Sequence, residues 1–148
     1  MSNIIILKVQ RKHKDFIIKA NRVINSVNET VQTNYLENNI EKDYFCDNPK
    51  FECLVAEYEG KPVGMILYSK FYWANDGEVL WISQMYVEKE YRNKGIFFEL
   101  IKALKNINKD IKIVSCATGE ENMRMQKILK YYGCREINLK FYYKKYEI

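Results

Sequence analysis

The 148-residue chain is poor in histidine and proline, and its cysteines are isolated from one another. It has one histidine, two prolines and four cysteines without a C-x-x-C pair: His13, Cys46, Cys53, Cys116 and Cys134. Because zinc sites draw on closely spaced cysteine and histidine ligands, we expect no bound metal. Cysteines spread in this way are typical of reduced thiols in a cytoplasmic protein.

A long apolar segment is also missing. No stretch approaches the roughly 18 consecutive apolar residues of a membrane-spanning helix. Residues 4–7 are apolar, but this run is too short for a signal peptide and no basic segment precedes it. We therefore expect a cytoplasmic protein without a membrane partner.

The excess of positive charge is modest. The chain has 24 Lys+Arg against 19 Asp+Glu, a net charge of +5. This excess fits an anionic partner, such as a nucleotide cofactor or a nucleic acid, and it fits equally a composition rich in Lys, Asn, Ile and Tyr. Since the lysines are scattered and no aromatic-basic stripe is present, we do not expect nucleic-acid binding.

Hydrophobic residues make up 47% of the chain, enough for a packed core. No linker, repeat or low-complexity tract divides the sequence. Length and pattern together predict a single domain over residues 1–148.

Hydrophobic spacing predicts the elements of the first part of the chain. β-Branched and alternating segments predict strands at residues 4–9, 52–58, 63–73 and 78–87. Helical spacing predicts helices at residues 13–28 and 31–45. Turn residues at 59–62 and 75–77 join the last three strands into an antiparallel meander.

The spacing changes after residue 87. Four apolar residues at i, i+3, i+4 and i+7 predict a helix that starts near Gly95: Phe97, Leu100, Ile101 and Leu104. A strand follows at 111–118, then a helix with Met125 and Ile128 on its apolar face and Gly133 at its end, then strands at 134–138 and 141–146. The expected fold is α+β, with a mixed, mainly antiparallel sheet of about seven strands and about four helices packed on it.

The segment over residues 85–97 carries the chemistry: Met85-Tyr86-Val87-Glu88-Lys89-Glu90-Tyr91-Arg92-Asn93-Lys94-Gly95-Ile96-Phe97. A strand ends at Val87, a basic loop follows, and Gly95 opens a helix. This arrangement directs backbone N–H groups and the positive end of a helix dipole at one point, where a pyrophosphate could bind. An ordinary strand-to-helix connection with a solvated basic loop would have the same pattern.

The same segment resembles the GNAT superfamily of N-acetyltransferases, whose motif is [Q/R]-x-x-G-x-[G/A] after a strand. Arg92 and Gly95 match the motif, and Met85-x-Val87 matches the end of the preceding strand. Downstream, Asn122 and the helix that ends at Gly133 resemble the second motif of the family. Residues 51–68 also resemble the diamine acetyltransferases, over a shorter stretch.

The resemblance implies that acetyl-coenzyme A is the co-substrate and that the acceptor is an amine. It implies that the Met85 N–H binds the thioester carbonyl, that the strand end pairs with the pantetheine arm and that the loop surrounds the pyrophosphate. The cofactor-binding residues that it implies are Met85, Tyr86, Val87, Arg92, Asn93, Lys94, Gly95, Ile96, Phe97 and Asn122.

Three positions depart from the family pattern. Phe97 stands where the family has a small residue; its ring either packs in the core, which we expect, or narrows the cofactor site. Leu129 stands where many members have a tyrosine that protonates the thiolate, so either Tyr132, one turn further on, or solvent is the acid.

The third departure is Ser83-Gln84, which replaces adjacent acidic residues on the strand of the diamine enzymes. Ser83 and Gln84 can orient a water or the substrate but cannot carry a negative charge, which makes a polyamine acceptor less expected. Glu57 and Glu78 are the nearest acidic residues on neighbouring strands, and we take Glu57 and Gln84 as candidate substrate-binding residues.

The chain is thus predicted to be an N-acetyltransferase in which a neutral amine of a small molecule or protein attacks the thioester directly. Met85, Ser83, Gln84 and Tyr132 are the candidate catalytic residues. The alternative is a catalytically degenerate module of the same fold that binds coenzyme A or a partner without turnover. The ends of the C-terminal strands offer a surface on which a homodimer could form.

Overall fold

The computed structural model describes residues 3–27, 34–137, 140, 142 and 144–146. The chain divides into two compact units, residues 1–117 and residues 118–148. The single domain expected over 1–148 stays a prediction.

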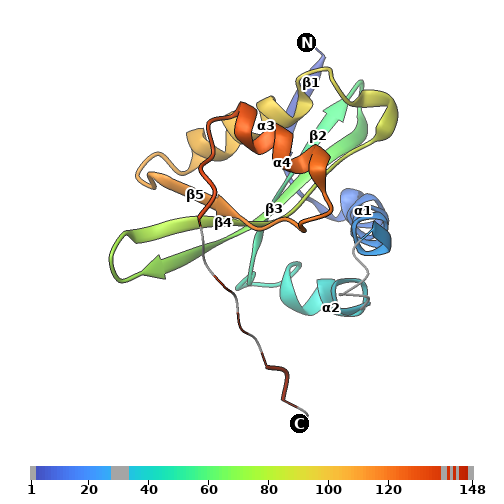
Figure 1. The fold of residues 1–148 in the computed structure, drawn as a ribbon. Helices are drawn as coiled ribbons and strands as arrows, with labels where there is room; N and C mark the ends of the chain where they lie inside the picture. Colours follow the sequence, from blue (N-terminus) through green and yellow to red (C-terminus); the bar gives the residue numbers. More distant parts are fainter. Residues whose placement is uncertain (1–2, 28–33, 138–139, 141, 143, 147–148) are drawn as a thin grey trace. The chain divides into compact units, whose positions relative to one another are not determined.

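The first unit is built on a five-stranded sheet in the order β1-β2-β3-β4-β5 (Figure 1). The strands are β1 (Ile4–Lys8), β2 (Glu52–Tyr58), β3 (Lys61–Trp73), β4 (Gly77–Val87) and β5 (Ile113–Cys116). Neighbours from β1 to β4 pair antiparallel, and β5 lies parallel to β4. The predicted α+β class and mainly antiparallel sheet are confirmed.

The expected number of about seven strands is too high for the described residues, which form five. Of the two C-terminal strands predicted at 134–138 and 141–146, residues 134–137, 142 and 144–146 are not in a strand. The other residues of those segments lie outside the described part. A run of apolar and aromatic residues has strand propensity, but it becomes a strand only where a neighbouring strand pairs with it.

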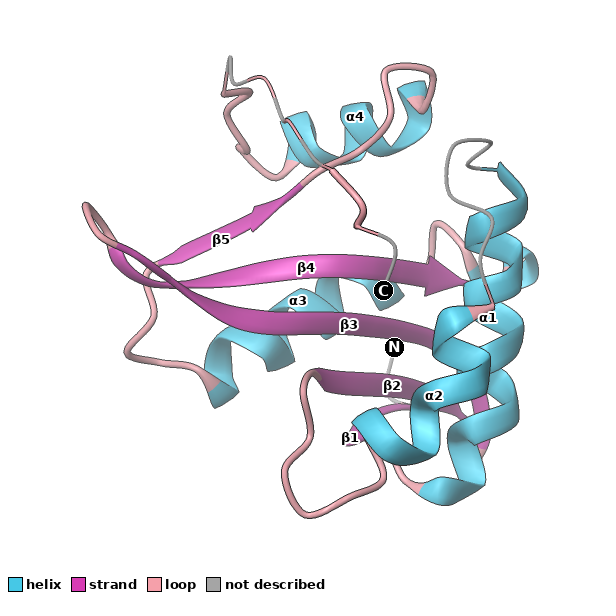
Figure 2. Cartoon of the chain, turned by 90° about the horizontal axis from the view of Figure 1, so that it is seen from below, coloured by secondary structure: helices cyan, strands magenta, loops and turns pink. Residues whose placement is uncertain are grey.

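The described residues form four α-helices, in line with the prediction of about four: α1 (Lys14–Val27), α2 (Tyr35–Asp43), α3 (Ile96–Ile107) and, in the second unit, α4 (Met123–Tyr131). Short 3₁₀ turns at Arg11–His13 and Lys89–Tyr91 precede α1 and α3. Within the first unit, α1 and α2 cover one face of the sheet and α3 covers the other (Figure 2). None of the described helices is long and apolar enough to cross a membrane.

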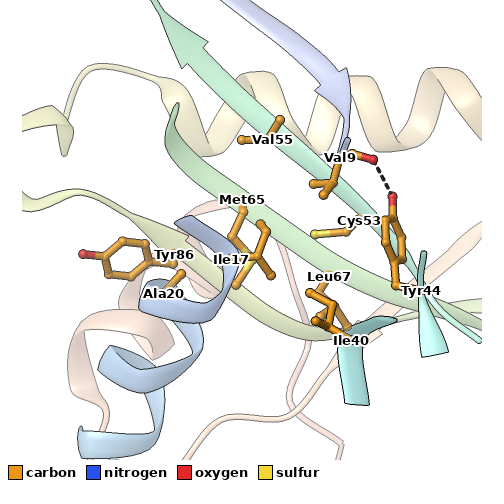
Figure 3. Close-up of a cluster of buried hydrophobic side chains, with 10 residues drawn as sticks. All are labelled: Val9, Ile17, Ala20, Ile40, Tyr44, Cys53, Val55, Met65, Leu67 and Tyr86. Atoms are coloured by element: carbon orange, nitrogen blue, oxygen red, sulfur yellow. Dashed lines mark hydrogen bonds between the residues drawn. The ribbon is translucent and has the colours of Figure 1, made fainter. Parts of the chain in front are cut away.

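Each face of the sheet has its own hydrophobic core, because successive side chains of a strand point to opposite faces. Cys53 and Val55 of β2 lie in the core under α1 and α2, with Met65 of β3 and Tyr86 of β4 (Figure 3). The Tyr44 hydroxyl donates a hydrogen bond to the carbonyl oxygen of Val9, 3.0 Å away, at the edge of this core (Figure 3).

The core on the other face is formed with α3. The helix contributes Ile96, Leu100 and Leu104 to this core, at positions i, i+4 and i+8. Leu54 and Ala56 of β2 are buried in the same core. Phe97 is half-buried and is not among the described residues that make up either core. The expectation that its ring packs in the core is not met: Phe97 follows the buried Ile96 by one residue, about 100° around the helix, and lies at the edge of the buried stripe rather than within it.

Candidate functional site

The candidate site lies at an irregularity in the pairing of β4 with β3. Leu67 pairs with Gln84 and Tyr68 pairs with Ile82, so Ser83 lies between them as the extra residue of a β-bulge. Bulges are common next to active sites, where they redirect side chains. The pairing of β4 with β5 ends at Ile82 and Cys116. From Ser83 onward, β4 is therefore paired with β3 alone among the described strands.

The backbone of the last β4 residues points alternately to the two edges of the strand. The N–H of Glu88 donates to the carbonyl oxygen of Val63 at 2.8 Å. The backbone groups of Glu88, and of every second residue before it as far as the bulge, therefore point to β3. Since the direction alternates, the backbone groups of Met85 and Val87 point to the opposite edge, past the end of β5. Consistent with this direction, Arg92 Nε donates to the Val87 carbonyl oxygen at 2.8 Å.

The loop after β4 has an unusual backbone at two residues. Asn93 has a φ of 63° and Gly95, the residue before α3, has a φ of 81°. Residues that have a Cβ are strained in this left-handed region of φ and ψ, whereas glycine adopts it without strain. A Cβ placed on Gly95 would have no atom within 4 Å, so this side of the helix start is open.

Two basic side chains of this loop have different surroundings. Arg92 is half-buried, and its Nε bonds to the loop's own strand. Lys94 is exposed, with its Nζ 5.4 Å from the centre of the Tyr91 ring. Lys94 therefore offers its charge at the surface beside Gly95, while Arg92 holds the loop to the end of β4.

An acidic residue at the same end of β4 is neutralised from within the protein. Glu88 accepts hydrogen bonds from Lys19 of α1 and from the Tyr86 hydroxyl, the latter at 3.1 Å. Burial acts to raise the pKa of Glu88, but the hydrogen bonds from Lys19 and Tyr86 bring it below its usual value. Glu88 is thus an ionised, paired carboxylate that fastens α1 to the start of the loop.

A pocket of about 230 Å³ lies beside the bulge, on the face covered by α1 and α2. Ser83 and Gln84 enter it from β4, and Asn21 Nδ2 of α1 donates to Gln84 Oε1 at 3.1 Å. The lining residues are Asn21, Tyr35, Leu36, Asp43, Phe51, Leu67, Ser83 and Gln84. The structure therefore brings the predicted Ser83 and Gln84 together with side chains of both helices.

Glu57 does not line this pocket. It is 6% exposed, accepts a hydrogen bond from His13 Nε2 at 2.7 Å, and lies 3.6 Å from Lys12 Nζ. His13 Nδ1 accepts from the N–H of Gln10, so the ring proton is on Nε2. The hydrogen bond from His13, opposed by burial, lowers the pKa of Glu57.

The register of β3 separates Glu57 from the bulge. Glu57 pairs with Pro62 and Gln84 pairs with Leu67, five residues further along β3, or roughly 16 Å. Sequence reasoning did not find the partner of Glu57, because His13 is 44 residues away and no spacing rule connects them. Asp43 was missed as well, although it follows Ile40 by three residues on the apolar side of α2.

In the second unit, Asn122 precedes α4 and caps it. Its Oδ1 accepts a hydrogen bond from the N–H of Met125 at 3.1 Å. Tyr132 ends the helix, and burial raises the pKa of its hydroxyl. Gly133 follows with a φ of 79°, the left-handed conformation common after a helix. Among the described residues, no cluster of three or more His, Cys, Asp or Glu side chains is placed to hold a metal ion.

The fold and the loop can be compared with known proteins. The family model described as "Acetyltransferase (GNAT) family" matches residues 21–133. The chain belongs to the GNAT acetyltransferase family. The resemblance noted on Arg92 and Gly95 is thereby confirmed at the level of the family.

One curated relative is named as a thialysine acetyltransferase, and another as a protein similar to spermidine/spermine acetyltransferases. The chain is 29% identical to the thialysine N-epsilon-acetyltransferase of Sus scrofa over 116 residues, 72% of this chain and 68% of that protein. It is 37% identical to the spermidine/spermine N(1)-acetyltransferase-like protein 1 of Homo sapiens over 73 residues. That match covers 45% of this chain and only a tenth (10%) of the human protein.

Solved structures share the fold over nearly the whole chain. A possible acetyltransferase from Clostridium difficile 630 aligns with a TM-score of 0.79 and 26% identity, covering 98% of this chain and 97% of that one. The aminoglycoside N-acetyltransferase AAC(6')-Iy in complex with CoA aligns with a TM-score of 0.76 and 18% identity, covering 96% and 94%. At that identity the second likeness shows the fold alone.

Proposed function

We propose that this GNAT acetyltransferase moves the acetyl group of acetyl-coenzyme A to a primary amine by direct attack. The observation that carries the proposal is the edge of β4 beyond Ile82, which no described strand pairs with and to which the backbone N–H of Met85 points. Gln84, the residue before Met85 on the same strand, lines the pocket together with Ser83. A donor for a carbonyl oxygen and a place for an amine are thus adjacent.

The residues of the first unit fit coenzyme A in two ways. The edge of β4 at Met85 and Val87 offers backbone groups to the amides of the pantetheine arm. The start of α3 offers N–H groups, an open Gly95 and the exposed charge of Lys94 to the pyrophosphate. Asn93, Ile96 and Phe97 belong to this second group, while Arg92 acts by holding the loop to Val87.

Tyr86 and Asn122 fit less direct roles. The backbone of Tyr86 faces β3, and its hydroxyl bonds to Glu88, so Tyr86 supports the strand end from the core side. The side-chain oxygen of Asn122 caps α4, which leaves its amide nitrogen as the group proposed to contact the cofactor.

The proposed chemistry needs few groups from the protein. Met85 N–H stabilises negative charge as it develops on the carbonyl oxygen, and the bound geometry removes much of the entropy cost of bringing amine and thioester together. Ser83 and Gln84 hold the amine or a water that accepts its proton. Tyr132 is the proposed proton donor to the thiolate; its raised pKa means that the hydroxyl keeps its proton.

An acceptor screen tests the proposal. The protein is mixed with acetyl-coenzyme A and a panel of primary amines, and release of free thiol is followed against a control without amine. Acetyl transfer predicts amine-dependent thiol release together with an acetylated product seen by mass spectrometry. If coenzyme A binds in calorimetry but no amine accelerates thiol release, the chain is the catalytically degenerate binding module instead.

A further inference from the structure

Asp43 has a position that the folding of α2 does not explain. It is the last residue of the helix and lies on its inward side with Leu36 and Ile40, seven and three residues earlier. The residue is 8% exposed. Amphipathic helices have apolar residues on this side, so an aspartate here is a departure from the pattern.

The carboxylate is unfavourable there in two respects. A negative charge at the C-terminal end of a helix is repelled by the helix dipole. Within the described part of the chain, Asp43 Oδ1 is also a buried oxygen without a hydrogen-bond donor. Oδ1 forms an ion pair with Lys50, whose Nζ lies 3.4 Å away on a side chain that is 69% exposed. Buried polar groups of this kind are rare in proteins and call for an explanation.

The pocket supplies that explanation, because Asp43 lines it together with Ser83 and Gln84. Ser83 and Gln84 are neutral and come from β4, whereas the carboxylate comes from α2. Tyr35, Phe51 and Leu67 supply aromatic and apolar walls. A ligand that fits this lining has a polar group for the strand, a short apolar body for the walls and a cation for Asp43.

We propose that Asp43 binds a second ammonium group of the acceptor, so that the enzyme prefers small diamines to monoamines. This inference rests on the proposed acetyl transfer at the same site. The carboxylate that β4 lacks at Ser83-Gln84 is provided by α2. The pocket volume of about 230 Å³ lies below the range of roughly 300–1,000 Å³ that is usual for drug-sized ligands, which favours a compact acceptor.

A matched pair of acceptors tests the inference. Binding of 1,4-diaminobutane and of n-butylamine to the protein saturated with coenzyme A is measured by calorimetry, and acetylation of both with acetyl-coenzyme A is measured in parallel. For the unaltered protein we expect the diamine to bind more tightly. For Asp43→Asn we expect diamine affinity to fall roughly 10- to 100-fold, the usual effect of losing one charged hydrogen bond, with monoamine affinity unchanged.

Two further variants give the test its controls. Asp47→Asn removes the same charge from an exposed residue that does not line the pocket, and it should leave the diamine preference unchanged. Lys50→Gln removes the cation that competes for Asp43 and should tighten diamine binding roughly twofold to fivefold. Because Lys50→Gln acts in the opposite direction, it keeps the inference testable even if Asp43→Asn folds poorly.

The outcomes separate the inference from the proposed function. A diamine preference that depends on Asp43 but comes without acetyl transfer would support the inference and refute the proposed catalysis. Acetyl transfer with equal affinity for both amines, or a preference that survives Asp43→Asn, would overturn the inference and leave the proposed function standing.

Discussion

Replacing Gly95 with alanine should weaken coenzyme A binding by more than its effect on folding explains. Gly95 has a φ of 81°, and a Cβ there meets no protein atom within 4 Å. The cost to the free protein is therefore backbone strain alone, about 1–2 kcal/mol for an L-residue in the left-handed region. In the complex, the same Cβ would occupy the open space at the start of α3 where we place the pyrophosphate.

Gly60 provides a matched control. It lies in the turn between β2 and β3, has a φ of 79°, and an added Cβ there also has no neighbour within 4 Å. Gly60→Ala and Gly95→Ala should thus lose similar stability, about 1–2 kcal/mol each. Only Gly95→Ala should lose coenzyme A affinity, by roughly tenfold or more, because a close phosphate contact is displaced.

Urea unfolding without ligand measures how much folding free energy each variant loses to backbone strain. Calorimetry with coenzyme A measures the dissociation constant of each variant. Ligand at 100 times its dissociation constant should stabilise the unaltered protein and Gly60→Ala by about 2.7 kcal/mol, and Gly95→Ala by less at the same concentration. Equal coenzyme A affinity for the two variants would refute the placement of the pyrophosphate at α3.

Four further results are expected. Phe97→Ala should cost about 1–2 kcal/mol and Leu100→Ala about 2–5 kcal/mol in chemical unfolding, since only Leu100 is in the core; equal losses would contradict the assignment. Because the pKa of Glu57 is lowered in the fold, its ion pair stabilises the protein above the unfolded value of 4.5 and is lost as pH falls through the folded pKa. The difference in free energy of unfolding between the unaltered protein and Glu57→Gln, measured by urea unfolding, should therefore decrease as pH falls below 4.5. Tyr132→Phe should slow acetyl transfer roughly 100-fold without changing coenzyme A affinity, and an unchanged rate would make solvent the acid. Asp43→Asn should raise the free energy of unfolding by about 0.5–1 kcal/mol, and a loss would mean that the carboxylate stabilises the fold.

Elements bounded by strong local signals were predictable from the sequence. The predicted strand at 52–58 coincides with β2, and the turn after it is made by Glu59 and Gly60, both with positive φ. The predicted start of one helix near Gly95 was also correct, as was the predicted end of the following helix at Gly133. In each case a glycine, or a short apolar run that ends at a turn, is a local signal that does not depend on distant residues.

Features that depend on distant residues were not predictable. The bulge at Ser83 arises from the register between β3 and β4, and sequence alone does not define a register. The one-residue error in the apolar stripe of α3 has a similar cause: Ile96 and Phe97 are both apolar, and the packing against the sheet decides which of them is buried. For the same reason the backbone roles of Met85 and Val87 needed the strand pairing, not their side chains.

The acidic residues of the first unit show why Asp43 is the one to associate with a ligand. Glu57 and Glu88 are held by donors from other elements: Glu57 by His13 and Lys12, and Glu88 by Lys19 and Tyr86. In both cases these donors lower the pKa of the carboxyl and overcome its burial.

Asp43 is as well buried as Glu57, yet its Oδ1 has no donor within the described residues and its helix end opposes its charge. Glu57 and Glu88 thus have hydrogen-bond donors from other elements, whereas the cation beside Asp43 is Lys50, whose side chain is 69% exposed. A cationic ligand would supply the missing donors, because an ammonium group carries three N–H bonds and the charge of the right sign. Glu57, by contrast, does not line the pocket, and its hydrogen bond with His13 holds η1 (Arg11–His13) against β2.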